Sequence, residues 1–317
     1  MNTSTPARSA IHVAGLRKSF GDKVVLDGID LDVPRGSVLS LLGPNGAGKT
    51  TMVQILSTLI GADGGDVSIG GRDLATDPDG VRGMIGVTGQ YSATDFLLTG
   101  EENLRLMGDL HHLGRRRSRR RAAELLERFD LVEAAGKSPI TYSGGMRRRL
   151  DLAMTLIGEP QIIFLDEPTT GLDPRSRRTM WDVIRRLVAD GVTIFLTTQY
   201  LEEADQLADR IALLDGGRLV AEGTAAELKR MVPGGHVRLK FADERGLRAA
   251  VRVLGGVPRA EDDLTLQVPG DGGVASLRVL LGALDAERIE VVDLSIHTPD
   301  LDDVFLSLTG RTEETVR

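Results

Sequence analysis

Short apolar runs alternate with amphipathic segments over most of the chain. The apolar run at residues 38–42 predicts a buried strand, and the apolar side chains after it recur at helical spacing, at Met52, Ile55, Leu56 and Leu59. Further apolar runs predict strands at residues 11–16, 24–26, 66–70, 84–90, 162–167, 192–198, 210–214 and 218–222. Strands separated by helical segments are typical of an α/β fold.

The C-terminal part repeats this alternation on a smaller scale. Strands and helices are predicted in turn at residues 237–241, 247–254, 264–268, 274–284 and 288–296, with a last helix beginning at Thr298 and Pro299. This βαβαβα order can close a small α+β core of its own, and Pro233 with the two glycines after it predicts a linker. His236 and His297 are isolated, so this part lacks the spacing of a metal site. We therefore expect two domains, at residues 11–231 and 236–310.

A glycine-rich loop follows the predicted strand 38–42 and opens the helix after it. Its pattern is that of a phosphate-binding loop, in which glycines let successive N–H groups point at one anion. Lys49 would place a positive charge on the β- and γ-phosphates, and Thr50 would ligate Mg²⁺. The strand before the loop and the helix after it argue against a glycine-rich turn without a ligand. The candidate nucleotide-binding residues are Gly43, Pro44, Asn45, Gly46, Ala47, Gly48, Lys49, Thr50 and Thr51.

Two adjacent carboxylates end the strand predicted at residues 162–167. Because successive side chains of a strand point to opposite faces, Asp166 and Glu167 are expected to do different work. We predict that Asp166 supports Mg²⁺ through a water molecule and that Glu167 polarises the water that attacks the nucleotide. Gln90 ends the strand predicted at residues 84–90. Its amide could reach the metal or the attacking water, or it could be a surface glutamine.

A second helix start with open N–H groups is predicted at Ser143, Gly144 and Gly145. Ser143 fits the N-cap position, and the glycines leave the first N–H groups of the helix accessible. The apolar residues from Met146 onward follow helical spacing. The segment is therefore either a second anion site or a simple capped helix.

Two further features leave alternatives open. Phe20, upstream of the phosphate loop, could stack on a base, which is typically worth about 1–3 kcal/mol, or it could fill the core. The arginine block at residues 115–121, interrupted only by Ser118, could be a solvated helix face. It could instead contact the head groups of acidic lipids, because such a block is attracted to an anionic surface.

The composition excludes several classes of function. With a net charge of -7 and a pI of about 5.4, the chain as a whole lacks the positive charge that is typical of nucleic-acid-binding proteins. The sequence has no cysteine, so disulfides, thiolate metal sites and cysteine nucleophiles are excluded. The N-terminus lacks the apolar core of a signal peptide, and no apolar run approaches the roughly 20 residues that cross a bilayer. If the protein works on a membrane, we expect another polypeptide to supply the membrane part.

The motifs, taken in this order and spacing, resemble those of the ATP-binding-cassette (ABC) ATPases over residues 11–231. The resemblance implies a P-loop NTPase cassette with a RecA-like core, and a helical subdomain at about residues 91–141 that meets a membrane partner at its joint with Gln90. It implies ATP and Mg²⁺ as cofactors. Under this resemblance Phe20 stacks on adenine, and Gln90 contacts the metal and the water.

The same resemblance implies that two copies of the cassette pair head to tail. One subunit would close on the ATP held by the other with its Ser143, Gly144 and Gly145. Asp173 would lie at the same interface between the two cassettes, called the seam below. This explains why one chain carries two anion sites. The C-terminal domain would serve dimerisation or regulation.

Gln199 departs from the common family pattern, in which a histidine contacts the γ-phosphate. A glutamine can donate a hydrogen bond but cannot become cationic. The segments 197–205, 142–149 and 301–310 look like those of one branch, the daunorubicin-resistance type of drug-export ATPase, in which glutamine is usual at this place. Gln199 therefore joins Lys49 and Glu167 as a candidate catalytic residue.

The favoured hypothesis is the ATP-hydrolysing subunit of a two-component exporter at the cytoplasmic face of the membrane. It would work as a homodimer with an integral membrane permease subunit and without nucleic acid, and it would move a hydrophobic drug, antibiotic or lipid-like compound. One alternative is a nucleotide-dependent clamp that acts on nucleic acid or ribosomes, against which the acidic charge and the single cassette weigh. Another is a non-hydrolysing scaffold, which Gln199 motivates.

Overall fold

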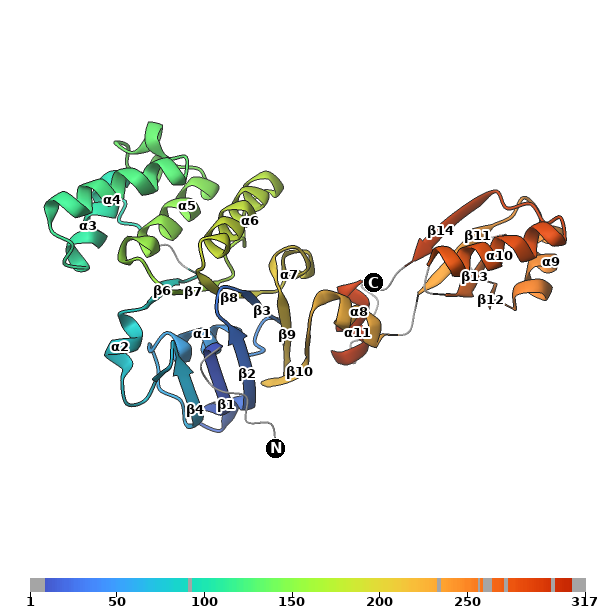
Figure 1. Ribbon diagram of the computed structural model, residues 1–317, viewed down its shortest axis with the longest axis horizontal. Coiled ribbons are helices and arrows are strands. Elements are labelled where there is room, and N and C mark those ends of the chain that lie inside the picture. The colour runs from blue at the N-terminus through green and yellow to red at the C-terminus, as the bar shows by residue number, and fades with distance from the viewer. Residues whose placement is uncertain are drawn as a thin grey trace. The chain divides into compact units, whose positions relative to one another are not determined.

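The computed structural model describes residues 9–90, 93–232, 235–255, 257–258, 264–270, 273–297 and 300–309. The chain forms two compact units, Met1–Ala225 and Ala226–Arg317 (Figure 1). The division falls at the start of helix α8 (Ala225–Met231). The predicted domain limits 11–231 and 236–310 therefore stay predictions. Residues 233–234 of the predicted linker and residues 298–299 of the predicted last helix lie outside the described residues.

The first unit is built on a six-stranded sheet in the order β10-β9-β3-β8-β7-β6. All neighbouring strands run parallel except β10, which pairs antiparallel with β9. The three central strands are buried at every position, as expected for apolar strands covered on both faces. The strands are β3 (Val38–Leu42), β6 (Ile85–Thr88), β7 (Ile162–Asp166), β8 (Thr193–Thr198), β9 (Arg210–Asp215) and β10 (Arg218–Gly223).

A second, antiparallel sheet belongs to the same unit, in the order β2-β1-β4-β5. Its strands are β1 (Ser9–Phe20), β2 (Lys23–Pro34), β4 (Gly64–Ile69) and β5 (Arg72–Asp73). The first two are longer than the predicted strands 11–16 and 24–26. They pair along their whole length, with several shifts of register. The prediction was too short because polar residues alternate with apolar ones in these strands, so the sequence shows no continuous apolar run.

Two apolar cores cover the two faces of the six-stranded sheet. One is formed with helix α1 (Lys49–Leu56) and the antiparallel sheet. The other is formed with α5 (Gly144–Thr155), α6 (Pro174–Ala189) and α7 (Leu201–Leu207). A short helix, α2 (Pro78–Arg82), precedes β6.

A group of helices stands beside the sheet, within the stretch where a helical subdomain is predicted (Figure 1). α3 (Gly100–Leu110) and α4 (Arg115–Arg128) pack together, followed by the 3₁₀ turns η2 (Val132–Ala134) and η3 (Pro139–Thr141). α3 begins with a capping box between Thr99 and Glu102, which satisfies the first N–H groups of the helix. A further 3₁₀ turn, η4 (Leu156–Gly158), follows α5.

The second unit has its own sheet and its own apolar core. The sheet runs β12-β13-β11-β14, and its neighbouring strands are antiparallel. Two helices cover it and supply the core with buried residues such as Ala250 and Leu284. The elements are β11 (His236–Lys240), α9 (Glu244–Leu254), β12 (Val257–Pro258), β13 (Thr265–Pro269), α10 (Val274–Ala286), β14 (Asp293–His297) and α11 (Leu301–Thr309). The alternation agrees with the predicted small α+β fold.

Candidate nucleotide-binding and catalytic site

The predicted phosphate loop joins the end of β3 to the start of α1. Gly46 and Gly48 have φ values of 82° and 110°, which residues with a side chain rarely adopt. A Cβ at Gly43 would lie 2.3 Å from the carbonyl oxygen of Leu214, so the backbone can pass β9 only as glycine. Pro44 accepts a hydrogen bond from the N–H of Ala47, which tightens the turn. The loop therefore has the curled backbone that an anion cradle needs.

Lys49, the first residue of α1, is buried inside this loop. Its Nζ donates hydrogen bonds to the carbonyl oxygens of Gly43 at 2.8 Å and Pro44 at 3.1 Å, and it lies 3.5 Å from Oε1 of Glu167. Burial lowers the pKa of the Lys49 ammonium, while the charges of Glu167 and Asp166 oppose that shift. The loop thus holds one cation between its own carbonyls and the carboxylates at the end of β7.

The carboxylate of Asp166 lies at the end of β7 and faces Thr50. The Oγ1 of Thr50 and Oδ1 of Asp166 are 3.5 Å apart, and Thr197 on β8 donates from its hydroxyl to the same oxygen at 2.5 Å. A hydroxyl and a carboxylate oxygen are the hard ligands that Mg²⁺ prefers, and the ion commonly takes few protein ligands beside phosphate and water. The donor set therefore fits Mg²⁺.

Glu167 does not follow the alternation that the sequence predicts. Its φ of 48° lies in the left-handed region, so the chain leaves the strand at this residue. Both carboxylates then face the phosphate loop, and the expected opposite orientation is wrong. The backbone N–H of Glu167 donates to Oγ1 of Thr197 at 3.0 Å, and the Thr170 hydroxyl donates to Oε2 of Glu167 at 3.1 Å. These bonds fix both the backbone and the carboxylate.

The two predicted glutamines follow the strands on either side of β7. Gln90 comes two residues after β6, and its side chain is exposed. Gln199 comes directly after β8, is half-buried, and lies next to Thr198, whose carbonyl accepts a hydrogen bond from the N–H of Gly43. Because the carboxyl ends of parallel strands share one edge, both glutamines lie on the side of the sheet that carries the loop.

Phe20, the last residue of β1, is 52% exposed. The alternative that it fills the core is therefore wrong. The ammonium of Lys18 lies 5.4 Å from the centre of the Phe20 ring, a cation–π distance. An exposed ring is free to stack on a flat group.

The predicted second helix start is formed as expected. Ser143 caps α5 by accepting a hydrogen bond from the N–H of Met146 at 3.2 Å, and Ser143 and Gly144 are exposed. A Cβ at Gly145 would lie 2.6 Å from Oγ of Ser176, so this glycine allows the close approach of α6. Asp173 caps α6, and hydrogen bonds from the hydroxyl and N–H of Ser176 lower the pKa of its carboxyl.

These two caps are separate from the phosphate loop of the same chain. Among the hydrogen bonds and ion pairs of the described residues, none joins Ser143 or Asp173 to residues 43–51. The structure therefore brings together Lys49, Thr50, Asp166 and Glu167, but not the cap of α5. Sequence reasoning missed Thr197, which holds Asp166 and Glu167 together. The available signal was its place near the end of the strand predicted at residues 192–198, and the structure sets it opposite Asp166 in the parallel pair of β7 and β8.

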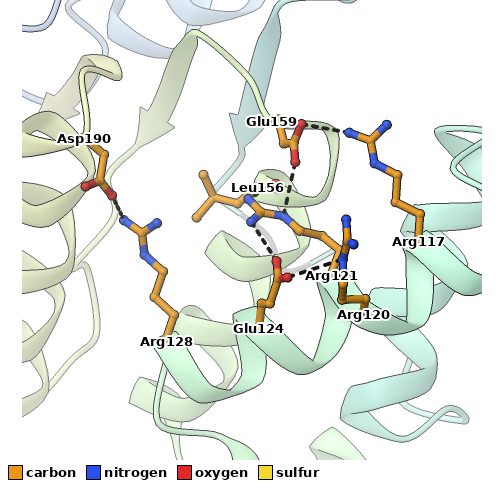
Figure 2. A network of polar contacts seen from close by, with 8 residues as sticks. All are labelled: Arg117, Arg120, Arg121, Glu124, Arg128, Leu156, Glu159 and Asp190. Atoms are coloured by element: carbon orange, nitrogen blue, oxygen red, sulfur yellow. Dashed lines mark hydrogen bonds and ion pairs between the residues drawn. The ribbon is translucent and has the colours of Figure 1, made fainter.

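The arginine block at residues 115–121 divides into two groups on α4, of which Figure 2 shows the one that forms ion pairs. Arg117 and Arg121 reach toward Glu159, and Arg120 and Arg121 contact Glu124 on their own helix. Figure 2 also shows Arg128 paired with Asp190. The remaining three arginines are exposed and form no ion pair with a described residue, namely Arg115, Arg116 and Arg119. At about 100° per residue these three share one side of the helix.

Among the described residues, no helix is long and apolar enough to cross a membrane.

The chain is similar to known proteins over nearly its whole length. It is 52% identical to the daunorubicin resistance ATP-binding protein DrrA3 of Streptomyces coeruleorubidus, covering 96% of this chain and 97% of that one. It is 47% identical to the daunorubicin/doxorubicin resistance ATP-binding protein DrrA of Streptomyces peucetius, covering 98% and 94%. It is 32% identical to the linearmycin resistance ATP-binding protein LnrL of Bacillus subtilis, covering 95% and 99%.

Solved structures and a family profile agree with these relatives. The dimeric structure of an ATP-binding cassette in a post-hydrolysis state, bound to ADP and phosphate, matches with a TM-score of 0.62 and 28% identity. The match covers 68% of this chain and 98% of that one. The profile described as ABC transporter matches residues 26–170, which contain the phosphate loop, the cap of α5 and both carboxylates. The chain belongs to the ABC transporter family, as one of its ATP-binding, ATP-hydrolysing subunits.

Proposed function

We propose that this chain powers the efflux of a hydrophobic drug, antibiotic or lipid-like compound through a separate membrane subunit. The observation that carries the proposal is the meeting of Lys49, Thr50, Asp166 and Glu167 at one edge of the sheet. The relatives named for drug resistance support the export role, and their similarity extends over both units of the chain. They also support a compound of that kind as the cargo.

The residues of the phosphate loop and of the end of β7 have different roles in binding and hydrolysing ATP. The backbone N–H groups of the loop and the Lys49 ammonium would bind the phosphates, and Thr50, together with Asp166 acting through a water molecule, would hold Mg²⁺. Bound Mg²⁺ supplies the charge that neutralises the phosphate oxygens during transfer. Glu167 accepts a proton from the attacking water, in a position fixed by Thr170 and Thr197. Phe20 stacks on the adenine.

Gln90 and Gln199 complete the reacting end of the site. Gln90, exposed two residues after β6, would contact the metal and the attacking water. Gln199 donates a hydrogen bond to the γ-phosphate in the place where many relatives carry histidine. Because the glutamine amide does not titrate near neutral pH, this contact keeps the same charge across the physiological range.

The active form is a head-to-tail pair of cassettes. Ser143 and Gly144 are exposed on each chain and, with Gly145, would offer the first N–H groups of α5 to the γ-phosphate held by the partner. Asp173, on the neighbouring helix start, lies at the same seam. The dimeric cassette among the similar solved structures supports this arrangement. Closing and reopening of the pair would move the membrane subunit.

The proposed function predicts that the chain copurifies with a membrane subunit and hydrolyses ATP with it. Coexpression with a candidate membrane subunit, followed by detergent extraction, should yield a complex that releases phosphate from MgATP. Cells with the complex should retain less of a fluorescent hydrophobic drug than cells with the Glu167→Gln complex. Copurification with RNA or ribosomes instead would favour a clamp. A stable complex without phosphate release would favour a scaffold.

We propose further that the chain works at the cytoplasmic face of the membrane, with the unpaired side of α4 toward anionic lipid. Each arginine near such a surface contributes about 1 kcal/mol. Changing Arg115, Arg116 and Arg119 to glutamine should therefore reduce cosedimentation with phosphatidylglycerol vesicles, by up to about 100-fold in the partition coefficient. Binding to phosphatidylcholine vesicles should be weak for parent and variant alike.

The matched control removes three exposed arginines of α9, at Arg245, Arg248 and Arg252. The net charge changes equally, so a general charge effect would weaken binding in both variants. If the α4 variant sediments like the parent, the block is a solvated helix face and nothing more.

A further inference from the structure

Arg148, in the second turn of α5, joins the two strand ends that carry the reacting groups. Its Nη1 donates to the carbonyl oxygen of Gly89 at 2.7 Å, and its Nε donates to that of Pro168 at 2.9 Å. Its Nη2 donates to the carbonyl oxygens of Asp166 at 3.0 Å and Glu167 at 3.3 Å. One planar guanidinium therefore holds four backbone carbonyls, which a lysine could not do in the same geometry.

These carbonyls flank the side chains that act on ATP. Gly89 directly precedes Gln90, and Asp166 to Pro168 enclose the peptide units on both sides of Glu167. The backbone of Glu167 is in the left-handed region, which is uncommon for a residue with a side chain and needs support from its surroundings. Arg148 supplies that support from one side, and Thr197 supplies it from the other.

The same helix carries the proposed contact to the partner's nucleotide. Ser143 caps α5 five residues before Arg148, which is about 7–8 Å along the axis. A helical turn over this distance moves as a rigid piece. A displacement of the Ser143 cap therefore shifts the guanidinium, and with it the backbone at Gly89 and Glu167.

The neighbouring arginines show that this connection is specific to one position. Arg147 donates to the carbonyl oxygens of Pro139 and Ile140. Arg149 donates to the carbonyl oxygen of Phe129 and contacts Asp130. The hydrogen bonds of both go to the end of α4 and the segment between α4 and α5, and Arg147 also lies over the Phe96 ring. Of the three consecutive arginines, Arg148 alone has its described hydrogen bonds on the strand ends.

We propose that Arg148 is a positioning residue that couples the two ATP sites of the dimer. When the Ser143 cap contacts the partner's ATP, α5 is displaced. Arg148 transmits this displacement to the backbone next to Gln90 and at Glu167 in the chain's own site. Each chain then aligns its general base when the partner's site is filled. This inference rests on the proposed head-to-tail dimer, and it adds a residue for which sequence reasoning gave no role.

The experiment measures phosphate release by the complex with its membrane subunit over a range of MgATP concentrations. The parent should show a Hill coefficient above 1, up to the limit of about 2 for two sites. Arg148→Gln should lower the maximal rate by about tenfold or more and bring the Hill coefficient to about 1. The Kd of MgATP for the chain alone should change less than about twofold, because the phosphate loop is untouched.

Arg149→Gln is the matched control. It removes a guanidinium of equal size and charge one residue away, and it should keep the parental rate and Hill coefficient. Arg148→Lys keeps the charge but reaches fewer carbonyls, so its rate should fall between those of the parent and Arg148→Gln. If Arg148→Gln does not fold, Arg148→Lys decides the question by the same two measurements.

The inference is overturned if the Arg148 variants keep the parental rate and Hill coefficient, or if Arg149→Gln shows the same losses. A parent with a hyperbolic dependence on MgATP would also overturn it. An active parent with insensitive Arg148 variants leaves the proposed function standing. A parent complex that releases no phosphate contradicts the proposed function itself.

Discussion

Replacing Glu167 with glutamine is expected to lower ATP turnover by about 10²–10⁴-fold, the range typical for the loss of a general base. The change removes the negative charge that lies 3.5 Å from Lys49 Nζ. It keeps the side-chain volume and an oxygen that can accept the hydrogen bond from Thr170. ATP binding should therefore persist. Phosphate release measures the turnover, and titration with a fluorescent ATP analogue measures the binding.

The same variant should accumulate the closed dimer in MgATP, because the nucleotide at the seam is no longer cleaved. Light scattering after size exclusion should then give twice the monomer mass. Glu202→Gln, at an exposed position of α7, is the control and should behave like the parent. Hydrolysis by Glu167→Gln at the parental rate would show that another group is the base.

Replacing Lys49 with alanine is expected to weaken ATP binding by about 10–100-fold. A hydrogen bond to a charged group is worth about 1.5–3 kcal/mol, and the ammonium makes such contacts with the phosphates. Lys49→Ala should leave the fold in place, because the loop backbone is also held by its own hydrogen bonds, from the N–H of Ala47 to Pro44 and from the N–H of Gly43 to Thr198. Calorimetric titration with MgATP gives the Kd, and the melting temperature without nucleotide checks the fold.

Lys240→Ala, at an exposed position of β11 in the second unit, is the control for Lys49→Ala. It removes the same charge away from the phosphate loop and should leave the Kd unchanged. An unchanged Kd in Lys49→Ala would mean that the loop binds no phosphate. A large loss of melting temperature in that variant would mean that Lys49 serves mainly the fold.

The sequence was sufficient to predict the strands and loops that carry the site. The central strands are buried on both faces, so their apolar runs are continuous and easy to recognise. The loop is equally easy to recognise, because its backbone needs positive φ values at Gly46 and Gly48 that favour glycine. The long strands β1 and β2 were underestimated, because their alternating polar residues interrupt the apolar signal.

Contacts that depend on three-dimensional placement could not be predicted in this way. The direction of the Glu167 side chain depends on a single backbone dihedral angle, and strand alternation gave the wrong answer. Arg148 sits in a run of three arginines, and nothing in the sequence distinguishes it from Arg147 and Arg149. Likewise, the arginine block on α4 looks uniform until the structure shows which members face Glu124 and Glu159.

The left-handed backbone at Glu167 sets a trade-off between stability and catalysis. A residue with a side chain stores roughly 1 kcal/mol or more in that conformation, which glycine would release at no cost to the turn. With Glu167 as the proposed general base, the protein gives up this free energy to aim the carboxylate at the phosphate loop.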